Sequence, residues 1–511
     1  MPSMPFRVAR SSRRWRSGGR DRVLLLIIAG LGLALVSIYG FLLPLDHSDH
    51  PGVAFGYQPL ATVMGTDHEG RTRFVAAVLG AYAVFLLAAV LASRLAGRRA
   101  CAAVLGGTVV LAAVLLPTNP AGAQDVYHNI ADARTFWVYG DNPAVTPPIE
   151  HRDDPFFKYI PAWPDTPSSY GPLWYVLSGV PLPFTGTSLW LNVLGQKVLT
   201  AAFLVLTTAL VMLTAARLRP GSAVLAGVLV GWNPLLQFET AGAAHNDIVM
   251  VCFAVGAFYA LSRRAWDFVF PLLALAVAVK YVLILLAPLF LLWMLLRRDV
   301  PRGQLARSVV AGVLLGAAWY VPFLADGALF DTLRGEGNRY LSSTGSFLVS
   351  VFMNQRHMGI PEAEQTMKRV LWAAFVASSL LLLTRFRRQP SYGLLIGTSA
   401  GVIFLFLVTV KWWFWPWYLT WLVPIAALAP RRGSALLATL FSCTAMLHYA
   451  AYYWGLYDEW HHHQRELFAV VFAPPLALAA LLVLWTLARG VARSVRRLRR
   501  TLLTPAEGVS R

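Results

Sequence analysis

Residues 119–175 read NPAGAQDVYHNIADARTFWVYGDNPAVTPPIEHRDDPFFKYIPAWPDTPSSYGPLWY. This stretch is polar, aromatic and rich in proline, and no window within it is apolar enough to span a bilayer. One apolar run leads directly into it and another follows it. We therefore predict a large loop that the rest of the chain holds at a membrane surface. Its seven carboxylates are Asp125, Asp132, Asp141, Glu150, Asp153, Asp154 and Asp165.

The composition excludes an ordinary soluble domain. The chain of 511 residues is 57% hydrophobic and 14% charged, whereas soluble domains carry about 25% charged residues. Apolar runs of near twenty residues recur along most of its length, which is typical of a polytopic helical membrane protein. The net charge is +19, but the arginines cluster beside apolar runs and no nucleic-acid-binding motif accompanies them. We therefore expect membrane lipids, and no nucleic acid, as partners.

The N-terminus is rich in arginine, and Arg13 and Arg14 precede an apolar run from Val23 to Leu45. This arrangement superficially resembles a twin-arginine signal. The run is long for the apolar core of a signal peptide and has no small-residue cleavage site. We therefore predict that it remains in the protein as the first membrane span.

Arginine-rich flanks orient the chain when they are placed in the cytoplasm, and both termini then lie inside. The predicted fold is all-α, a polytopic integral membrane protein of about 14 transmembrane helices. Residues 171–182 are too short to cross and are expected to lie at the outer leaflet. The predicted spans are 23–44, 73–94, 100–117, 187–216, 222–238, 247–262, two short helices within 265–297, 307–324, 368–384, 392–410, 416–430, 434–452 and 467–488.

Neither the cysteines nor the histidine tract indicates a metal site. Cys101, Cys252 and Cys443 lie within or beside apolar runs, and their odd number does not fit a disulfide framework. Residues 461–463 are histidines in a predicted outer loop, but adjacent histidines point in different directions on regular structure. No glycine-rich phosphate loop occurs, which fits a donor that is already membrane-bound. The sequence thus indicates no certain cofactor and leaves a divalent metal open.

Asp125 follows the outer end of the third predicted span, and Asp132 lies seven residues further on. A helix here would place both carboxylates on one face. A carboxylate at the boundary of the apolar layer loses hydration and becomes a stronger base, which suits the deprotonation of a sugar hydroxyl. Asp125 could equally cap the helix that follows it. The spacing alone does not decide between these two interpretations.

All five lysines fall in the outer half of this topology, whereas the cytoplasmic flanks use arginine. Positive charge on the outer side opposes the usual topological rule. Either an anionic substrate at the outer leaflet requires it, or chance placement and snorkelling explain it. Lys280 lies in the middle of an apolar run, where an ammonium is costly unless it is paired. The lysines are Lys158, Lys197, Lys280, Lys368 and Lys411.

Five motifs occur in order: QDVYHNIADARTFWVYGDNP, SSYGPLWY, NPLLQFETAGAAHND, AVAVKYVLILLAPL and FWPWYLTWLVP. Together they resemble the GT-C superfamily of membrane glycosyltransferases and, within it, the polyprenyl-phosphate-mannose-dependent α-mannosyltransferases of bacterial envelope glycolipids and lipoglycans. The resemblance runs from about residue 100 to 430. It implies that an acidic residue in the first large outer loop is the catalytic base, and the matching residue is Asp125.

The resemblance divides the chain around a catalytic membrane core at 100–430, with its outer loop at 118–186. The first two spans, at 23–99, are expected to precede this core. The remaining predicted parts are a basic cytoplasmic tail at 1–22, C-terminal spans at 431–488 and a second basic tail at 489–511.

Several polar and aromatic residues are candidates for contact with substrate. The His-Asn-Asp triplet at an outer hairpin turn could bind a donor phosphate or merely cap a helix. The aromatic cluster beside Lys411 could stack on sugar or form an interfacial belt. Arg334, Arg339, Arg356 and His357 could also meet phosphate. The candidate substrate-binding residues are Tyr127, His128, Asp132, Tyr170, His245, Asn246, Asp247, Lys280, Lys411, Trp415 and Tyr418.

The predicted function is transfer of a hexose from a polyprenyl-phosphate donor to a cell-envelope glycolipid or polysaccharide. Mannose is the hexose that the resemblance favours. The resemblance implies inversion at the sugar, with the active site on the outer face of the plasma membrane. One alternative is a flippase or transporter of a lipid-linked sugar, which would also need intramembrane charge. Another is a GT-C enzyme that uses arabinofuranose or glucose.

Overall fold

The computed structural model describes residues 19–42, 60–120, 122–160, 163–324, 342–356, 359–429, 432–455 and 460–503. Nine helices within these ranges are long and apolar enough to cross a membrane. They confirm an all-α, polytopic membrane protein. They are α1 (Gly19–Leu42), α3 (His68–Ala92), α4 (Arg98–Leu115), α8 (Leu189–Leu218), α14 (Arg302–Tyr320), α17 (Ile360–Arg388), α18 (Tyr392–Leu405), α20 (Arg432–Gly455) and α22 (Ala473–Leu503). The span of α18 includes the π-helix that continues it to Val410.

Each of these nine helices falls on a predicted span, and the other five predicted spans fall on short or broken helices. The number of about 14 crossings therefore stays a prediction. The short helices are α9 (Ala223–Gly231), α10 (Pro234–Gln237), the π-helix η3 (Phe238–Gly242), α11 (Asp247–Arg263), the 3₁₀-helix η4 (Trp266–Phe268), α12 (Val269–Val279), the 3₁₀-helix η5 (Tyr281–Leu286), α13 (Ala287–Leu296), the 3₁₀-helix η8 (Pro416–Trp421) and α19 (Val423–Leu428).

The breaks have local causes. A new helix begins after Asn233. Its side-chain oxygen caps α10 by accepting hydrogen bonds from the N–H groups of Leu235 and Leu236. Pro234 then occupies the first turn of α10, where a missing N–H costs nothing. The run at 265–297 divides at Lys280, whose backbone is extended between α12 and η5. Two half-helices are therefore present there, as predicted.

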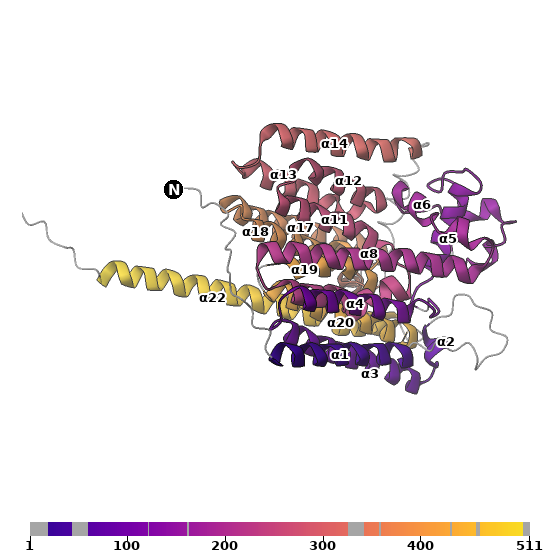
Figure 1. Ribbon diagram of the computed structural model, residues 1–511, viewed down its shortest axis with the longest axis horizontal. Coiled ribbons are helices and arrows are strands. Elements are labelled where there is room, and N and C mark those ends of the chain that lie inside the picture. Colours follow the sequence, from indigo (N-terminus) through magenta and orange to yellow (C-terminus); the bar gives the residue numbers. More distant parts are fainter. Residues whose placement is uncertain are drawn as a thin grey trace, which may run out of the picture.

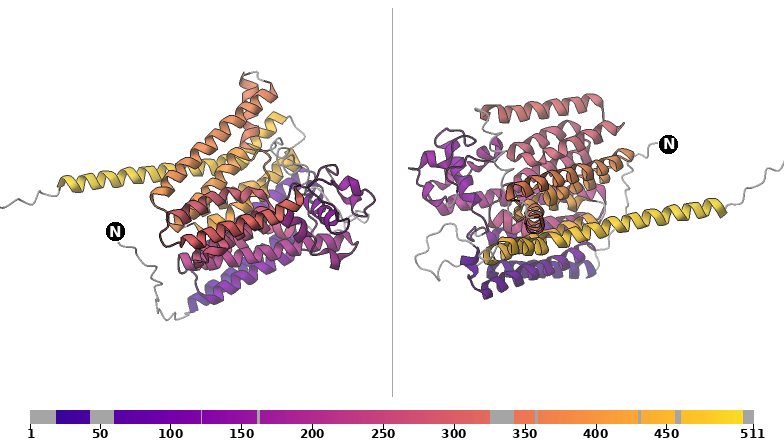
Figure 2. Two further views of the ribbon diagram at one scale, coloured as in Figure 1. Left: turned by 90° about the horizontal axis from the view of Figure 1, so that it is seen from above. Right: turned by 180° about the vertical axis from the view of Figure 1, so that it is seen from behind.

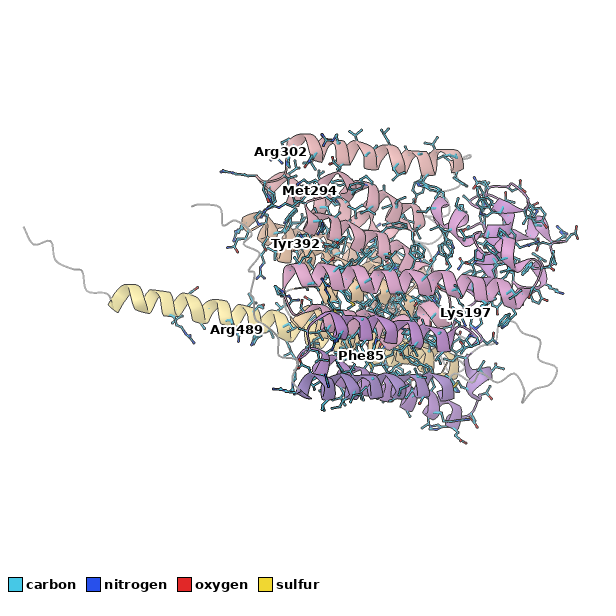
Figure 3. The ribbon with its side chains drawn as sticks, viewed as in Figure 1. Phe85, Lys197, Met294, Arg302, Tyr392 and Arg489 are labelled. Carbon is cyan, nitrogen blue, oxygen red and sulfur yellow. The ribbon has the colours of Figure 1, made fainter. Side chains whose placement is uncertain are left out.

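The predicted outer loop folds into short helices that gather at one end of the bundle (Figure 1). Helix α22 projects beyond the opposite end, and the further views show the same arrangement (Figure 2). Arg302 and Arg489 lie toward that opposite end, whereas Lys197 lies near the loop (Figure 3). The loop elements are α5 (Asp125–Trp137), η1 (Pro148–His151), η2 (Phe157–Tyr159), α6 (Pro172–Ser178) and α7 (Leu182–Thr185).

The remaining elements complete the bundle. Buried apolar side chains from α1 to α22 form one continuous core beneath the loop, in which Trp174, Trp232 and Trp421 are fully buried. The other elements are α2 (Leu60–Met64), the 3₁₀-helix η6 (Val321–Phe323), α16 (Thr344–Arg356), the π-helix η7 (Phe406–Val410), α21 (Trp460–Leu467) and the π-helix η9 (Phe468–Phe472).

Candidate active site

Helix α5 carries the two carboxylates that the sequence singles out. Its apolar side chains, Val126 and Ile130 among them, are buried, and this fixes the helix against the bundle. Asp125 lies in the first turn, where a negative charge is favourable beside the free N–H groups of a helix. Asp132 lies on the same side of α5, and both carboxylates line one cavity.

A buried lysine fixes the chain just before α5. The Nζ atom of Lys197, on α8, lies 2.8 Å from the carbonyl oxygen of Leu115 and 3.2 Å from that of Leu116, and it also reaches Thr118. These carbonyls end α4 and have no partner within that helix. Lys197 is fully buried and does not line the cavity. Because Lys197 reaches neither the cavity nor solvent, neither contact with an anionic substrate nor snorkelling explains its position.

Asp125 has two contacts from other parts of the chain. The hydroxyl of Tyr170 donates a hydrogen bond of 3.0 Å to Oδ2 of Asp125. Nε2 of His245 lies 3.9 Å from the same oxygen, which is too long for a hydrogen bond. Burial, followed by the charge of Asp125, raises the pKa of Tyr170 well above its ordinary value, so the phenol stays protonated and can keep donating.

Behind His245 lies a buried glutamate. Nδ1 of His245 lies 3.0 Å from Oε2 of Glu239, and the hydroxyl of Tyr449 donates to Oε1 of Glu239 at 2.9 Å. Burial alone would lower the pKa of His245, but the hydrogen bond and charge of Glu239, with the charge of Asp125, raise it above its ordinary value. The imidazole thus lies between two carboxylates.

Asp132 is a second carboxylate of different character. Its side chain is 4% exposed and accepts a hydrogen bond from the hydroxyl of Ser168. Burial raises the pKa of Asp132 to about 7, against an opposing effect from Ser168. At pH 7 this carboxyl is therefore about half protonated, and the protonated form can donate a hydrogen bond.

A glycine allows the loop that carries Tyr170 to pack closely against the bundle. The N–H of Gly171 donates to the carbonyl oxygen of Val279 at 2.9 Å, one residue before Lys280. A Cβ atom at position 171 would lie 2.2 Å from the carbonyl oxygen of Ala278. Only glycine allows this approach, which places Tyr170 beside Lys280.

Lys280 lies at the junction of α12 and η5 and lines the cavity. Its Nζ atom is 3.0 Å from Oδ1 of Asp247, an oxygen that also accepts a bond from Nε1 of Trp421. The same Nζ lies 5.3 Å from the ring centre of Tyr170 and 5.2 Å from that of Tyr418. These distances are typical of cation–π contacts, so Lys280 is held by a carboxylate and surrounding rings.

Lys411 and the aromatic residues that follow it form another wall of the cavity. Its Nζ atom lies 4.7 Å from the ring centre of Tyr418. Trp415 and Trp417 stack at 5.0 Å, and Trp417 in turn stacks on His245 at 4.2 Å. The aromatic cluster therefore continues from the cavity wall to the histidine behind Asp125.

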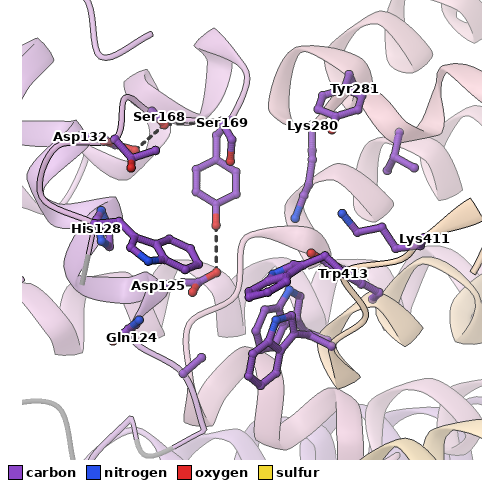
Figure 4. Close-up of a pocket in the computed structure, with 18 of the residues that line it drawn as sticks. Gln124, Asp125, His128, Asp132, Ser168, Ser169, Lys280, Tyr281, Lys411 and Trp413 are labelled. Carbon is purple, nitrogen blue, oxygen red and sulfur yellow. Dashed lines mark hydrogen bonds between the residues drawn. The ribbon is translucent and has the colours of Figure 1, made fainter. Parts of the chain in front are cut away.

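These side chains surround one cavity of about 720 Å³. Figure 4 shows Lys280 and Lys411 across this cavity from Asp125. Eight of the predicted site residues line it, namely Asp125, His128, Asp132, Tyr170, Lys280, Lys411, Trp415 and Tyr418. Four predicted residues do not line it. His245 lies behind Asp125, and Asp247 lies behind Lys280. Asn246, which stands between His245 and Asp247 in the sequence, is buried. Tyr127 is buried on the apolar side of α5.

Sequence reasoning missed several residues at this site. Glu239 lies beside His245, and Tyr449 donates to Glu239. An ionisable residue beside an apolar span was the available signal for Glu239. Ser168 belonged to a recognised motif, but nothing in the sequence paired it with Asp132. The other residues missed in the lining include Gln124, Trp163, Ser169, Tyr281, Trp421, Tyr452 and Tyr453, whereas Trp413 and Trp417 belong to the predicted aromatic cluster beside Lys411.

Other candidates lie away from the cavity or outside the described residues. Lys368 pairs with Glu364, and Lys158 lies over the ring of Tyr159. Arg334, Arg339 and His357, the side chains of Arg356 and of His461, His462 and His463, and the tail that contains Arg13 and Arg14 lie outside the described residues. Within the described ranges, no group of three His, Cys, Asp or Glu residues is arranged to hold a metal ion. A divalent metal stays an untested expectation.

The polytopic helical bundle, with a carboxylate across one cavity from two ammonium groups, fits the GT-C membrane glycosyltransferases that the motifs resemble. The family described as alpha-(1->6)-mannopyranosyltransferase, N-terminal domain, matches residues 28–297, which is more than half of the chain. The protein therefore belongs to this mannosyltransferase family. No curated protein matches the chain.

The family match begins inside the first span, whereas the resemblance seen in the motifs begins near residue 100. The match thus covers most of both N-terminal spans as well as much of the predicted core, and the division of the chain at residue 100 stays a prediction. The match includes Asp125, Asp132, His245 and Lys280 and ends before Lys411 and its aromatic cluster.

Proposed function

We propose that the protein transfers mannose from a polyprenyl-phosphate donor to a glycolipid or glycan acceptor of the cell envelope, with Asp125 as general base. The observation that carries this proposal is the position of Asp125 across one cavity from Lys280 and Lys411. A base is needed at the acceptor hydroxyl, and positive charge is needed at the leaving phosphate. The family description supports mannose as the sugar and an α-(1→6) linkage in the product.

In the proposed reaction, the acceptor oxygen attacks the anomeric carbon as Asp125 removes the hydroxyl proton. The bond from that carbon to the phosphate oxygen breaks on the opposite face, and the electron pair leaves with the phosphate. A single displacement of this kind inverts the anomeric configuration. Lys280 and Lys411 would stabilise the charge that develops on the phosphate, where preorganised cations act most strongly.

The two sides of the cavity differ in polarity, as a lipid-linked donor and a polar acceptor would require. Tyr281, Val282 and Phe406 line its bundle side, beside Lys280 and Lys411, and offer apolar surface to the first isoprene units of the donor. Residues of the outer loop line its other side, where Asp132 and Ser168 could hydrogen-bond acceptor hydroxyls. We propose that the donor enters from the membrane and the acceptor from the loop side.

The proposed location is the outer face of the plasma membrane. The arginine-rich helix ends, such as those at Arg217 in α8, Arg263 in α11 and Arg388 in α17, favour the cytoplasm. The loop that carries Asp125 gathers at the end of the bundle opposite to Arg302 and Arg489 (Figures 1 and 3). Polyprenyl-phosphate sugars are membrane-bound, so such a site needs no soluble nucleotide-sugar.

The test is transfer of labelled mannose from polyprenyl-phosphate mannose by the purified full-length protein in bilayer discs. We expect Asp125→Asn to lose transfer by about 10³-fold or more, because a general base and its charge are removed together. Asp153→Asn is the matched control, since Asp153 is exposed in the same loop and does not line the cavity. Unchanged transfer in Asp125→Asn would remove Asp125 from this role.

Competition distinguishes the sugars. Polyprenyl-phosphate arabinofuranose or glucose should fail to reduce mannose transfer at equal concentration. A donor that is translocated across vesicles without being consumed would instead indicate a transporter.

A further inference from the structure

Behind Asp125 lie two buried residues, Glu239 and His245, that have no role in the proposed reaction as described above. We propose that this pair receives the acceptor proton from Asp125, with Glu239 as the positioning residue that holds His245 for the task. The inference rests on the proposed function, because it concerns the fate of the proton that Asp125 removes.

The hydrogen-bond acceptors around His245 decide which ring nitrogen can change its protonation. Nδ1 lies 3.0 Å from Oε2 and 3.1 Å from the carbonyl oxygen of Glu239. Both are acceptors, so Nδ1 carries a hydrogen whether the ring is neutral or charged. Nε2 is therefore the nitrogen that gains or loses a proton.

Nε2 of His245 faces Asp125 and makes no hydrogen bond within the described residues. The side chain of His245 is 1% exposed, so bulk water does not satisfy this nitrogen. A buried polar atom without a partner is costly. Its distance of 3.9 Å from Oδ2 of Asp125 is longer than a hydrogen bond, but catalytic hydrogen bonds commonly shorten only when substrate binds.

The backbone around the pair is unusual. Glu239 lies in the π-helix η3, and π-helical turns occur frequently at functional sites. Ala244, which directly precedes His245, has φ of 61°. A non-glycine residue in this left-handed region carries strain, and such strain clusters at active sites. The strained turn and the stacked ring of Trp417 together fix the direction of the imidazole.

Charged and titratable groups approach the pair from several elements. Asp125 approaches from α5 and Tyr449 from α20, while Asp247 begins α11. Tyr170, from the loop before α6, donates to Asp125. Asp247 is already paired with Lys280, so Asp125 and Glu239 are the carboxylates left to share the imidazole.

The proton balance is simple. The acceptor hydroxyl loses its proton to Asp125 as the new glycosidic bond forms and the phosphate leaves with its electron pair. The proton then passes to Nε2, which forms an imidazolium that the carboxylate of Glu239 stabilises. Asp125 returns to the anion, so it cannot reprotonate the new glycosidic oxygen and reverse the transfer. The proton leaves through Asp125 to water when the product departs.

The experiment compares pH–rate profiles of mannose transfer for the wild type, Glu239→Gln and Glu239→Asp. In Glu239→Gln the backbone carbonyl oxygen of residue 239 can still accept from Nδ1, but the charge of the side chain is gone. We expect kcat to fall about tenfold with little change in KM, and the acid limb to move to lower pH by about one pH unit, because the imidazole becomes less basic. Glu239→Asp keeps the charge and should keep the acid limb near its wild-type position.

His245→Phe provides a second test that is independent of Glu239. The phenyl ring can stack on Trp417 but carries no proton, so kcat should fall and the acid limb should again move to lower pH. Glu69→Gln is the matched control, because Glu69 is an exposed carboxylate on α3, far in sequence from the site. Thermal unfolding of each variant shows whether it is folded.

The outcomes separate the two proposals. If the wild type transfers no mannose, the proposed function fails and the pH profiles have no bearing. If the wild type transfers mannose but the acid limb stays in place in both Glu239→Gln and His245→Phe, the proton-receiving role is wrong, whatever the loss in rate. A loss of rate that is equal at every pH indicates a merely structural role for Glu239.

Discussion

The Nζ atom of Lys280 lies 3.0 Å from Oδ1 of Asp247, and the side chain of Asp247 is 1% exposed. Asp247 begins α11 and Lys280 lies between α12 and η5, so that Lys280 lines the cavity and Asp247 lies behind it. An ammonium in the apolar layer needs such a partner, and so does the buried carboxylate. Lys280 can therefore serve two purposes, because it neutralises Asp247 and also presents charge to the cavity.

This pairing predicts that Lys280→Met loses both stability and transfer. Removing the ammonium leaves Asp247 buried without its partner, which should cost about 3–5 kcal/mol in the free energy of unfolding. Transfer should fall by about 10²–10³-fold, because one cation facing the donor phosphate is lost. Thermal unfolding and mannose transfer in bilayer discs measure the two effects.

The double variant Lys280→Met with Asp247→Asn separates them. Removing the orphaned charge should recover most of the lost stability but none of the lost transfer. Lys368→Met is the control, since Lys368 pairs with Glu364 and does not line the cavity. Recovery of transfer in the double variant would contradict a role for Lys280 at the donor.

The contact between Gly171 and α12 gives a second prediction. Gly171 has an ordinary φ of −85°, so replacing it by alanine tests space alone and not backbone conformation. A methyl group there meets the carbonyl oxygen of Ala278 and should push the loop away from α12, at a cost of about 1–3 kcal/mol. Because Tyr170 precedes Gly171, we expect transfer to fall by much more than stability alone would explain.

Thermal unfolding and transfer again provide the measurement, and Gly106→Ala provides the control. Gly106 lies on α4 with nothing near the place of a Cβ atom, so its replacement should leave both quantities close to the wild type. If Gly171→Ala transferred mannose at the wild-type rate, the loop would not need this contact to position Tyr170.

Much of the bundle could be predicted because single spans depend on local composition. The nine long helices, the division of 265–297 into two half-helices and the short α6 all follow from apolar length, arginine flanks and proline. The span predicted at 222–238 is instead broken, because Asn233 and Pro234 start a new helix inside an apolar run. A prediction from hydrophobicity alone does not detect such a helix start.

The site could be predicted only in part, for a physical reason. Asp125 was identifiable because it directly follows an apolar run in a polar loop. The Lys280–Asp247 pair joins residues that are 33 positions apart, and the Glu239–Tyr449 bond joins residues 210 positions apart. Such partners depend on how helices cross, which no local pattern encodes. Lys197 shows the same limit, since its partners are backbone carbonyls of another helix.

Lys197 gives a third prediction. Lys197→Met should fill similar space without donating to the carbonyls that end α4. Leaving these buried acceptors without their side-chain donor should lower the free energy of unfolding by about 1–3 kcal/mol. Thr118, which precedes Asp125 in the chain, then loses its contact with α8, so transfer should also fall.

Thermal unfolding with added donor distinguishes structural from substrate-binding lysines. We expect Lys197→Met to keep the stabilisation that polyprenyl-phosphate mannose gives the wild type, whereas Lys411→Met should lose most of it. If Lys197→Met lost this stabilisation while keeping the wild-type melting temperature, its role would lie at the donor after all.

Asp132 gives a prediction about pH. Burial raises the pKa of its carboxyl to about 7 in the folded protein, whereas the same group ionises near pH 4 in an unfolded chain. Between about pH 4 and pH 7 the folded state therefore holds a proton that the unfolded state has lost. Its contribution to the free energy of unfolding must fall as the pH rises through this window, and it is constant above it.

Asp132→Asn removes this titration, while its amide oxygen can still accept the hydrogen bond from Ser168. Between pH 5 and pH 7.5, we expect the melting temperature of the wild type to fall by several degrees more than that of Asp132→Asn. Asp153→Asn, with its exposed side chain, should keep the wild-type slope. Equal slopes in the wild type and Asp132→Asn would mean that Asp132 is ionised throughout, so that it accepts hydrogen bonds from an acceptor sugar and cannot donate one.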